Sequence, residues 1–156
     1  AYKKALIALE QAKRSAEEMK ADWIIVDGSP GTGCPGIASI TGADAVVIVT
    51  EPTLSGQHDL ERVAALARHF DIPFSVIVNK ADINRTMAEA TEAWCARNGV
   101  PFLGNIPYDT AFTKAQIRGM SVVELYEASD ESPDANDGDM TDAITLIWER
   151  ICQLKR

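Results

Sequence analysis

The sequence lacks any cluster of lysine and arginine, and its formal net charge is -8 at pH 7. Binding to a nucleic-acid backbone needs several cations on one face, so we expect no nucleic acid as a direct partner. Long apolar runs are also missing. The longest, at 23–26 and 45–49, are far too short to cross a bilayer, and no signal sequence opens the chain. We therefore expect no transmembrane segment and a cytoplasmic location.

Cysteine is scarce in this chain. Cys34, Cys95 and Cys152 are far apart and form no C-x-x-C pair, which argues against a disulfide framework and a self-contained zinc site. An initiator methionine is absent as well, and the chain begins inside a helical pattern, so we expect a piece of a longer protein. Its 156 residues show no repeats and predict a single α/β domain over 1–156.

The apolar residues follow two different periods along the chain. One is the 3.6-residue period of an amphipathic helix, at 2–20. The other is that of short, β-rich runs suited to buried strands, at 23–26, 45–49, 74–78 and 100–103. Helical patterns separate these runs, and such alternation predicts a three-layer α/β/α fold with a mainly parallel sheet.

Local signals mark helix ends and the C-terminal region. Ser55 is expected to cap the helix at about 55–70, and Thr86 with Glu89 fits a capping box for the next helix. The acidic stretch 128–139, which contains proline and glycine, predicts a mobile surface linker. Residues 140–156 carry one apolar stripe and predict a C-terminal helix.

A hydrophobic run ends in Asp27 and opens into a loop of glycine and proline. A carboxylate at the end of a parallel strand lies where ligands bind in open α/β folds, and it can orient Mg²⁺ through water. Gly28, Pro30 and Gly31 follow, and glycines let backbone N–H groups approach a terminal phosphate. We expect a phosphate site with Asp27 as its catalytic residue. The alternative is a tight turn in which Asp27 caps the next helix.

A second interpretation of this loop is a Rossmann-like dinucleotide-binding domain. Residues 31–36 satisfy G-x-G-x-x-G, and Glu51 ends the next run as a dinucleotide-binding acid would. Four residues separate Gly31 from the apolar run, however, and Pro35 stiffens the turn where a pyrophosphate would lie. These two features favour the phosphate-sensing interpretation.

Two further loops carry groups that can recognise a base. Asn79, Lys80 and Asp82 form an N-K-x-D pattern after a predicted strand. The amide can hydrogen-bond base nitrogens, the lysine stem can lie over the ring, and the carboxylate can accept donors. Pro107 and Tyr108 follow the next run and can wall a base. The alternative for the N-K-x-D residues is an ordinary polar loop that caps a helix.

The segments IIVDGSPGTGCP, VVIVTEPTLSGQHDLERV, VIVNKADIN and GNIPYD, in this order and spacing, resemble the MinD/ParA/Mrp group of deviant-Walker P-loop ATPases. They look most similar to the MinD-superfamily ATPases that carry an inserted ferredoxin domain. The resemblance covers the chain from about residue 22 to residue 124 and implies a P-loop NTPase-like fold.

This resemblance implies a role for each matching residue. Asp27 would be the Walker B and switch II aspartate near Mg²⁺, and Gly28 to Gly31 the loop that senses the γ-phosphate. Asn79 would contact adenine, and Pro107 and Tyr108 would line the base pocket. Glu51 would follow the strand next to the nucleotide. The segment 53–62 would transmit the nucleotide state to the dimer face.

The chain departs from the family at one point. It contains no G-x-x-x-x-G-K-[ST], so the lysine that reaches the β- and γ-phosphates and the hydroxyl that holds Mg²⁺ are absent. We expect ATP and Mg²⁺ to bind the full-length parent, and no hydrolysis by this chain alone. A sheet without the P-loop strand exposes an edge, which favours a homodimer or a strand-exchanged oligomer.

Cys34 lies seven residues after Asp27, the spacing at which the related nitrogenase iron protein places a cluster-ligating cysteine. The resemblance therefore implies a [4Fe-4S] cluster in the parent, though not in this chain alone, and an iron-sulfur or redox protein as partner. The alternative is a small thiol buried under the loop. Two other functions stay open: a non-enzymatic α/β interaction module, and GTP in place of ATP, because Asp82 completes a guanine-type motif.

Overall fold

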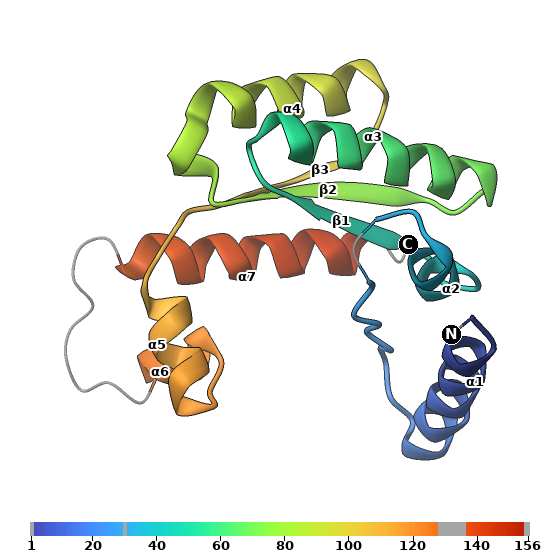
Figure 1. The fold of residues 1–156 in the computed structure, drawn as a ribbon. Helices are drawn as coiled ribbons and strands as arrows, with labels where there is room; N and C mark the ends of the chain where they lie inside the picture. Colours follow the sequence, from blue (N-terminus) through green and yellow to red (C-terminus); the bar gives the residue numbers. More distant parts are fainter. Residues whose placement is uncertain (1, 30, 128–136, 155–156) are drawn as a thin grey trace. The chain divides into compact units, whose positions relative to one another are not determined.

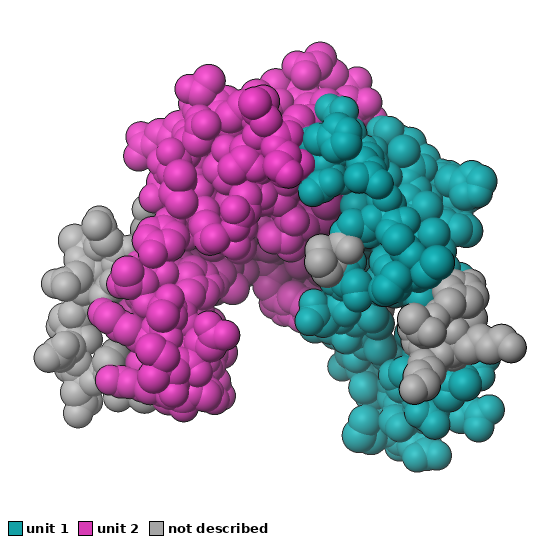
Figure 2. Space-filling model, in the orientation of Figure 1, with its two compact units in different colours: residues 1–46, 58–74 teal, residues 47–57, 75–156 magenta. Residues whose placement is uncertain are grey.

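The structure, a computed structural model, describes residues 2–29, 31–127 and 137–154 (Figure 1). Side chains are described for 7–29, 31–127 and 140–154. The chain forms two compact units, one of residues 1–46 and 58–74 and the other of residues 47–57 and 75–156 (Figure 2). Each unit has its own internal packing and is described separately.

A three-stranded sheet forms the centre of the second unit. Its strands are β1 (Val46–Thr50), β2 (Phe74–Asn79) and β3 (Phe102–Ile106), in the order β1-β2-β3. Strands β2 and β3 are parallel, with Val76 opposite Phe102 and Ile77 opposite Gly104. The register therefore shifts at Leu103, which is the extra residue of a bulge. The runs predicted at 45–49 and 74–78 are confirmed as strands, and the run at 100–103 overlaps β3.

Successive side chains of β2 point to opposite faces of the sheet, and each face has its own helix. Ile77 packs with Leu103 and Ile147 under α7 (Asp137–Gln153). Val78 packs with Ala81 and Ala88 under α4 (Arg85–Arg97) on the other face (Figure 1). A mainly apolar strand covered on both faces is typical of α/β proteins. The predicted α/β class with a parallel sheet is confirmed.

The bulge in β3 is covered by α7. Nη1 of Arg150 donates to the carbonyl oxygen of Leu103 at 2.7 Å. Gly104 has a φ of +146°, and a Cβ there would lie 3.1 Å from Cγ1 of Ile147. Glycine is therefore the residue that lets α7 approach this strand closely.

The helix caps differ in part from the sequence signals. Asn84, the last residue of the short 3₁₀ helix η1 (Ala81–Asn84), caps α4 through its side-chain oxygen, which accepts from the N–H of Met87 at 3.1 Å. The predicted capping box of Thr86 and Glu89 is therefore wrong. The first N–H groups of a helix have no partner within the helix. An asparagine directly before the first turn can accept from them, and Asn84 lies directly before α4, whereas Thr86 of the predicted box lies within it.

A genuine capping box lies at the start of α6 (Val122–Glu127). Ser121 N–H donates to Oε2 of Glu124 at 2.7 Å, and Glu124 N–H donates to Ser121 Oγ at 3.2 Å. Hydrogen bonding of the Glu124 carboxylate to the backbone and to the side chain of Ser121 lowers the pKa of Glu124. Helix α6 and its neighbour α5 (Ala111–Arg118) pack with Met140 of α7 in a small apolar cluster.

The first unit contains α1 (Tyr2–Met19) and α2 (Cys34–Ile40), together with α3 (Leu54–His69) from residue 58 onward. Lys13 Nζ of α1 donates to the carbonyl of Gly42 at 3.1 Å, just after α2. Residues 22–29 have no helical or strand geometry, so the strand predicted at 23–26 is wrong.

The physical reason lies in the pairing that a strand requires. A strand is stabilised by hydrogen bonds to a neighbouring strand. The sheet formed by the described residues consists of β1, β2 and β3, and residues 23–26 are not part of it. The run consequently leaves large apolar side chains in solvent, with Ile25 78% exposed.

Helix α7 begins at Asp137, within the stretch predicted as a linker, and residues 128–136 lie outside the described residues. None of the helices in the described part of the chain combines the length and apolar character that a membrane span requires.

Candidate functional site

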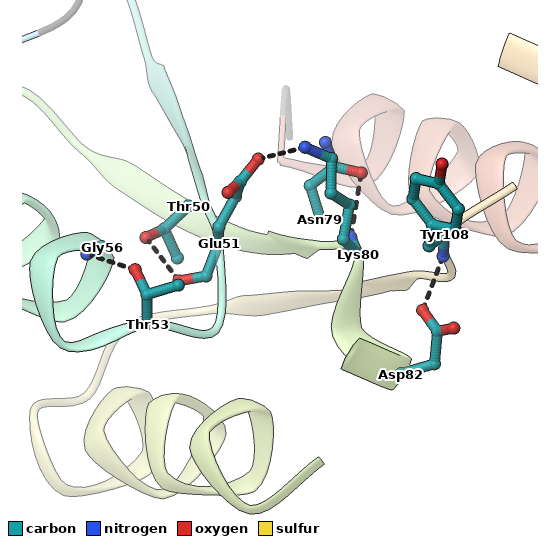
Figure 3. A network of polar contacts seen from close by, with 8 residues as sticks. All are labelled: Thr50, Glu51, Thr53, Gly56, Asn79, Lys80, Asp82 and Tyr108. Atoms are coloured by element: carbon teal, nitrogen blue, oxygen red, sulfur yellow. Dashed lines mark hydrogen bonds and ion pairs between the residues drawn. The ribbon is translucent and has the colours of Figure 1, made fainter. Parts of the chain in front are cut away.

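The loops after the three strands bring six predicted site residues to one edge of the sheet. Figure 3 shows all of them except Pro107. Each loop begins at the carboxyl end of its strand, which is where open α/β sheets bind ligands. The six residues are Glu51 after β1, Asn79, Lys80 and Asp82 at the end of β2 and beyond it, and Pro107 and Tyr108 after β3.

An ion pair joins the first two of these loops. Lys80 Nζ lies 2.6 Å from Oε1 of Glu51, and the two side chains are 38% and 49% exposed. The hydrogen bond to Glu51 and the charge of that carboxylate raise the pKa of Lys80 above its ordinary value of 10.5. The ammonium group is therefore directed at Glu51.

Asn79 and Lys80 form a sharp turn at the end of β2. The side-chain oxygen of Asn79 accepts from the N–H of Lys80 at 3.0 Å, and Lys80 has a left-handed backbone with a φ of 55°. This conformation costs a non-glycine residue roughly 1–2 kcal/mol. Because the amide oxygen is already bonded to the backbone, the two N–H donors of the Asn79 amide are left for an acceptor.

Asp82 connects the second loop to the third. Its Oδ1 accepts from the backbone N–H of Tyr108 at 2.6 Å. Both groups are exposed, and a charged acceptor makes this a stronger bond than one between neutral partners. Asp82 thus fixes the backbone next to Pro107. A pocket of about 340 Å³ lies beside this connection and is lined in part by Asp82, Arg85, Asn105 and Pro107.

Two residues at the turn from β1 into α3, Thr53 before the helix and Gly56 in its first turn, were not predicted to bind the nucleotide. Thr53 Oγ1 accepts from the N–H of Gly56 at 2.9 Å, so Thr53, rather than the predicted Ser55, bonds to the first turn of α3. A Cβ on Gly56 would collide with the carbonyl oxygen of Glu51 and would lie 2.8 Å from Thr50 Oγ1. Gly56 is therefore required for the tight return of this loop.

The predicted phosphate loop lies in the first unit. Asp27 and Gly28 are exposed, Gly31 has a φ of 79°, and Pro30 lies outside the described residues. Gly36 packs so closely on the carbonyl oxygen of Gly31 that a Cβ would collide with it. The loop therefore folds back onto the start of α2.

Cys34 is the first residue of α2, and its side chain is exposed. The alternative of a thiol buried under the loop is therefore wrong. In the described part of the chain, no group of three or more histidine, cysteine, aspartate or glutamate side chains is arranged to hold a metal ion. A role of Cys34 in binding a cluster stays a prediction.

Residues 4–138 match the family described as ParA: NUBPL iron-transfer P-loop NTPase. The chain belongs to the MinD/ParA/Mrp family of P-loop NTPases. The order of the four quoted sequence segments therefore led to the correct family. Membership in this family also agrees with the placement of the three loops at the carboxyl edge of a parallel sheet.

Individual relatives of this P-loop NTPase chain support the same assignment. The uncharacterised protein MJ0578 of Methanocaldococcus jannaschii is 33% identical over 76 residues, which are 49% of this chain and 28% of that protein. The iron-sulfur cluster carrier protein of Pyrococcus horikoshii is 28% identical over 135 residues, with 77% of this chain and 44% of that protein covered. The chain thus spans less than half the length of these relatives.

A solved structure shows the same fold. The cell division ATPase MinD of Pyrococcus furiosus superimposes with a TM-score of 0.73 at 19% identity, and covers 99% of this chain and 59% of its own. At that identity the likeness establishes the fold, and the predicted P-loop NTPase-like architecture is confirmed.

Proposed function

We propose that this P-loop NTPase chain is the switch II and base-recognition portion of a MinD/ParA-type ATPase whose complete form binds ATP with Mg²⁺. The observation that carries the proposal is the convergence of three loops at one sheet edge. Two contacts hold them there, Lys80 to Glu51 at 2.6 Å and Asp82 to Tyr108 at 2.6 Å. A preformed edge of this kind is where nucleotides bind in open α/β folds.

The base is adenine in this proposal. The free N–H donors of Asn79 match the ring-nitrogen acceptors of a purine, and Pro107 and Tyr108 provide apolar walls. A guanine-type site needs a carboxylate that accepts two donors from the base. Asp82 Oδ1 accepts from the N–H of Tyr108, and the remaining lone pairs of the carboxylate leave guanine as the alternative base.

In this proposal Asp27, Gly28 and Gly31 of the first unit serve the phosphates. Mg²⁺, when bound, neutralises charge that develops on the phosphates. Asp27 is an exposed carboxylate that can hold a water of the metal shell, and the exposed glycines give backbone N–H groups room to approach a phosphate oxygen. The hydrolytic water would be the nucleophile, and catalysis would consist of positioning and charge stabilisation.

The downstream chemistry in this proposal involves iron-sulfur clusters. The family description names iron transfer, and one relative is called an iron-sulfur cluster carrier protein. The exposed thiol of Cys34 at the start of α2 is the candidate ligand. Anaerobic reconstitution of the complete protein with iron and sulfide tests it: Cys34→Ser should bind less iron, and an unchanged iron content would remove the role.

Calorimetry of the complete protein with ATP and Mg²⁺ tests the main proposal. We expect a clear binding heat, and Asn79→Ala should weaken binding about tenfold because a buried base acceptor loses its donor. Gln116→Ala, an exposed substitution on α5, is the matched control and should leave binding unchanged. Absence of a binding heat, or equal affinity in Asn79→Ala, would refute the proposal.

The chain alone should not hydrolyse ATP, because the P-loop lysine is missing from its sequence. Phosphate release from the isolated chain, measured colorimetrically, should equal that of buffer. Release that disappears in Asp27→Ala would contradict this expectation.

We also propose that the exposed apolar run 23–26 pairs with a strand from another copy of the chain. The isolated chain should then associate in light scattering, and Ile25→Lys should reduce its mass. A monomeric unsubstituted chain would contradict the proposal.

A further inference from the structure

Arg62 and Thr32 form a long-range hydrogen bond within the first unit. Nη2 of Arg62, on α3, donates to Oγ1 of Thr32 at 2.8 Å, and 30 positions separate the two residues in the sequence. Nη1 of Arg62 lies 3.9 Å from Oδ1 of Asp59, one turn earlier on the same helix. The guanidinium group therefore bridges a regular helix and the loop after Asp27.

Thr32 is well placed to anchor this loop. Its neighbours in the sequence, Gly31 and Gly33, have no side chains, and Gly31 has a left-handed backbone with a φ of 79°. Glycines give the loop many accessible conformations and no side-chain contacts of their own. A hydroxyl fixed from outside the loop therefore restricts its backbone, in addition to the bond from Ile37 N–H to the Gly33 carbonyl at 3.0 Å.

The contact is also easily reversed. The side chains of Arg62 and Asp59 are 54% and 56% exposed, and exposed ion pairs contribute little to stability because water competes for both partners. The hydroxyl of Thr32 accepts from Arg62 and keeps its own proton available to another acceptor. A contact of this kind can hold the loop in one arrangement and release it when the loop gains a ligand.

We propose that Arg62 is a positioning residue for ATP hydrolysis, acting through the Thr32 hydroxyl to hold residues 31–33 of the loop after Asp27. The inference rests on the proposed function of that loop as the sensor of the γ-phosphate. Arg62 touches the loop and no reacting atom. It places the backbone N–H groups of the loop where charge develops during phosphoryl transfer, and small misplacements of such donors are costly to the rate.

This role predicts a specific kinetic pattern in the complete protein. Arg62→Ala should lower kcat for ATP hydrolysis about tenfold, because the donors are no longer held in place. The KM for ATP should change by less than about twofold, since the base-binding loops are intact. Thr32→Val, which replaces the hydroxyl with a methyl group of similar volume, should have the same effect.

The double variant decides whether the two residues act as one unit. If Arg62 works through Thr32, Arg62→Ala should have no further effect in the Thr32→Val background. Thr32→Ser keeps the hydroxyl and should retain activity, and Arg62→Lys should restore part of it. Arg97→Ala, an exposed arginine of α4, is the matched control and should behave like the unsubstituted protein.

Hydrogen exchange on the chain itself provides a second readout. Amides of residues 31–33 should exchange faster in Arg62→Ala and in Thr32→Val, and equally fast in the double variant. Independent, multiplying effects on kcat, or an unchanged kcat and exchange rate in Arg62→Ala, would overturn the inference. An unsubstituted complete protein that neither binds nor hydrolyses ATP would instead overturn the proposed function on which it rests.

Discussion

Lys80 Nζ and Glu51 Oε1 lie 2.6 Å apart and connect the loops that follow two neighbouring strands. The pair lies where the loop after β2 meets the loop that leads into α3. It keeps a lysine of the N-K-x-D pattern directed at the protein, whereas the sequence pattern predicts a lysine stem over a purine ring. The effect of this contact on the pKa of Lys80 can be measured without any ligand.

Glu51→Gln should lower the pKa of Lys80 toward its ordinary value of 10.5, because the hydrogen bond to a carboxylate and its charge are the causes of the upward shift. A raised pKa means that the pair stabilises the folded chain fully below pH 10.5 and loses this contribution as pH rises through the folded-state value. NMR titration of the Lys80 side chain measures its pKa in Glu51→Gln and in the unsubstituted chain. An equal pKa in Glu51→Gln would show that the pair does not form in solution.

Gly56→Ala should destabilise the chain by about 2 kcal/mol, because the added methyl group collides with the carbonyl of Glu51 and forces the loop to move. Urea unfolding measures the loss. Gly33→Ala is the matched control: its nearest neighbour would be Pro35 Cδ at 3.7 Å, an ordinary contact. Equal stability of the two variants would show that the loop is looser than the structure indicates.

Ser121→Ala should cost about 1 kcal/mol through loss of the cap on α6. It should also raise the pKa of Glu124 part of the way toward 4.5: the backbone N–H of Ser121, the larger cause of the lowering, is retained, and the contribution of the side chain is lost. A lowered pKa stabilises the folded chain above pH 4.5 and loses this effect as pH falls through the folded-state value. Ser55→Ala, where no cap is formed, is the control. A loss in Ser55→Ala as large as in Ser121→Ala would contradict the assignment.

The three thiols should react with an alkylating reagent in order of exposure. Burial, together with the Glu92 carboxylate, raises the pKa of the Cys95 thiol to about 11, so little thiolate forms at pH 8. Cys34 is exposed and should be modified first. Peptide mapping by mass spectrometry should find Cys95 modified only after unfolding. Early modification of Cys95 in the folded chain would refute its burial.

The strands predicted correctly are those whose apolar pattern is enough to identify a buried strand. The runs at 45–49 and 74–78 are apolar in the way that a strand covered on both faces requires. The run at 23–26 has the same composition and is no strand, because composition does not reveal whether a partner strand is present. Caps show the same limit: Thr86 and Glu89 fit the pattern, but Asn84 lies closer to the helix start and makes the bond.

The site was predictable at the level of loops and only partly at the level of contacts. Motif order placed Asn79 and Tyr108 at the same sheet edge. The bonds from Tyr108 to Asp82 and from Arg62 to Thr32 join residues 26 and 30 positions apart. Such pairs follow from the three-dimensional arrangement of the chain and leave no local signal in the sequence.

The bulge at Leu103 gives the sheet a direction in which it can be extended. At β3 the ladder is irregular, and the Leu103 carbonyl is already occupied by the Arg150 side chain, so an incoming strand would find mismatched geometry and one acceptor fewer. Strand β1 is the other border strand of the sheet that the described residues form. Any further strand should therefore add beside Val46–Thr50. Because Arg150 of the C-terminal helix occupies the Leu103 carbonyl, the sheet should be extended at one edge only.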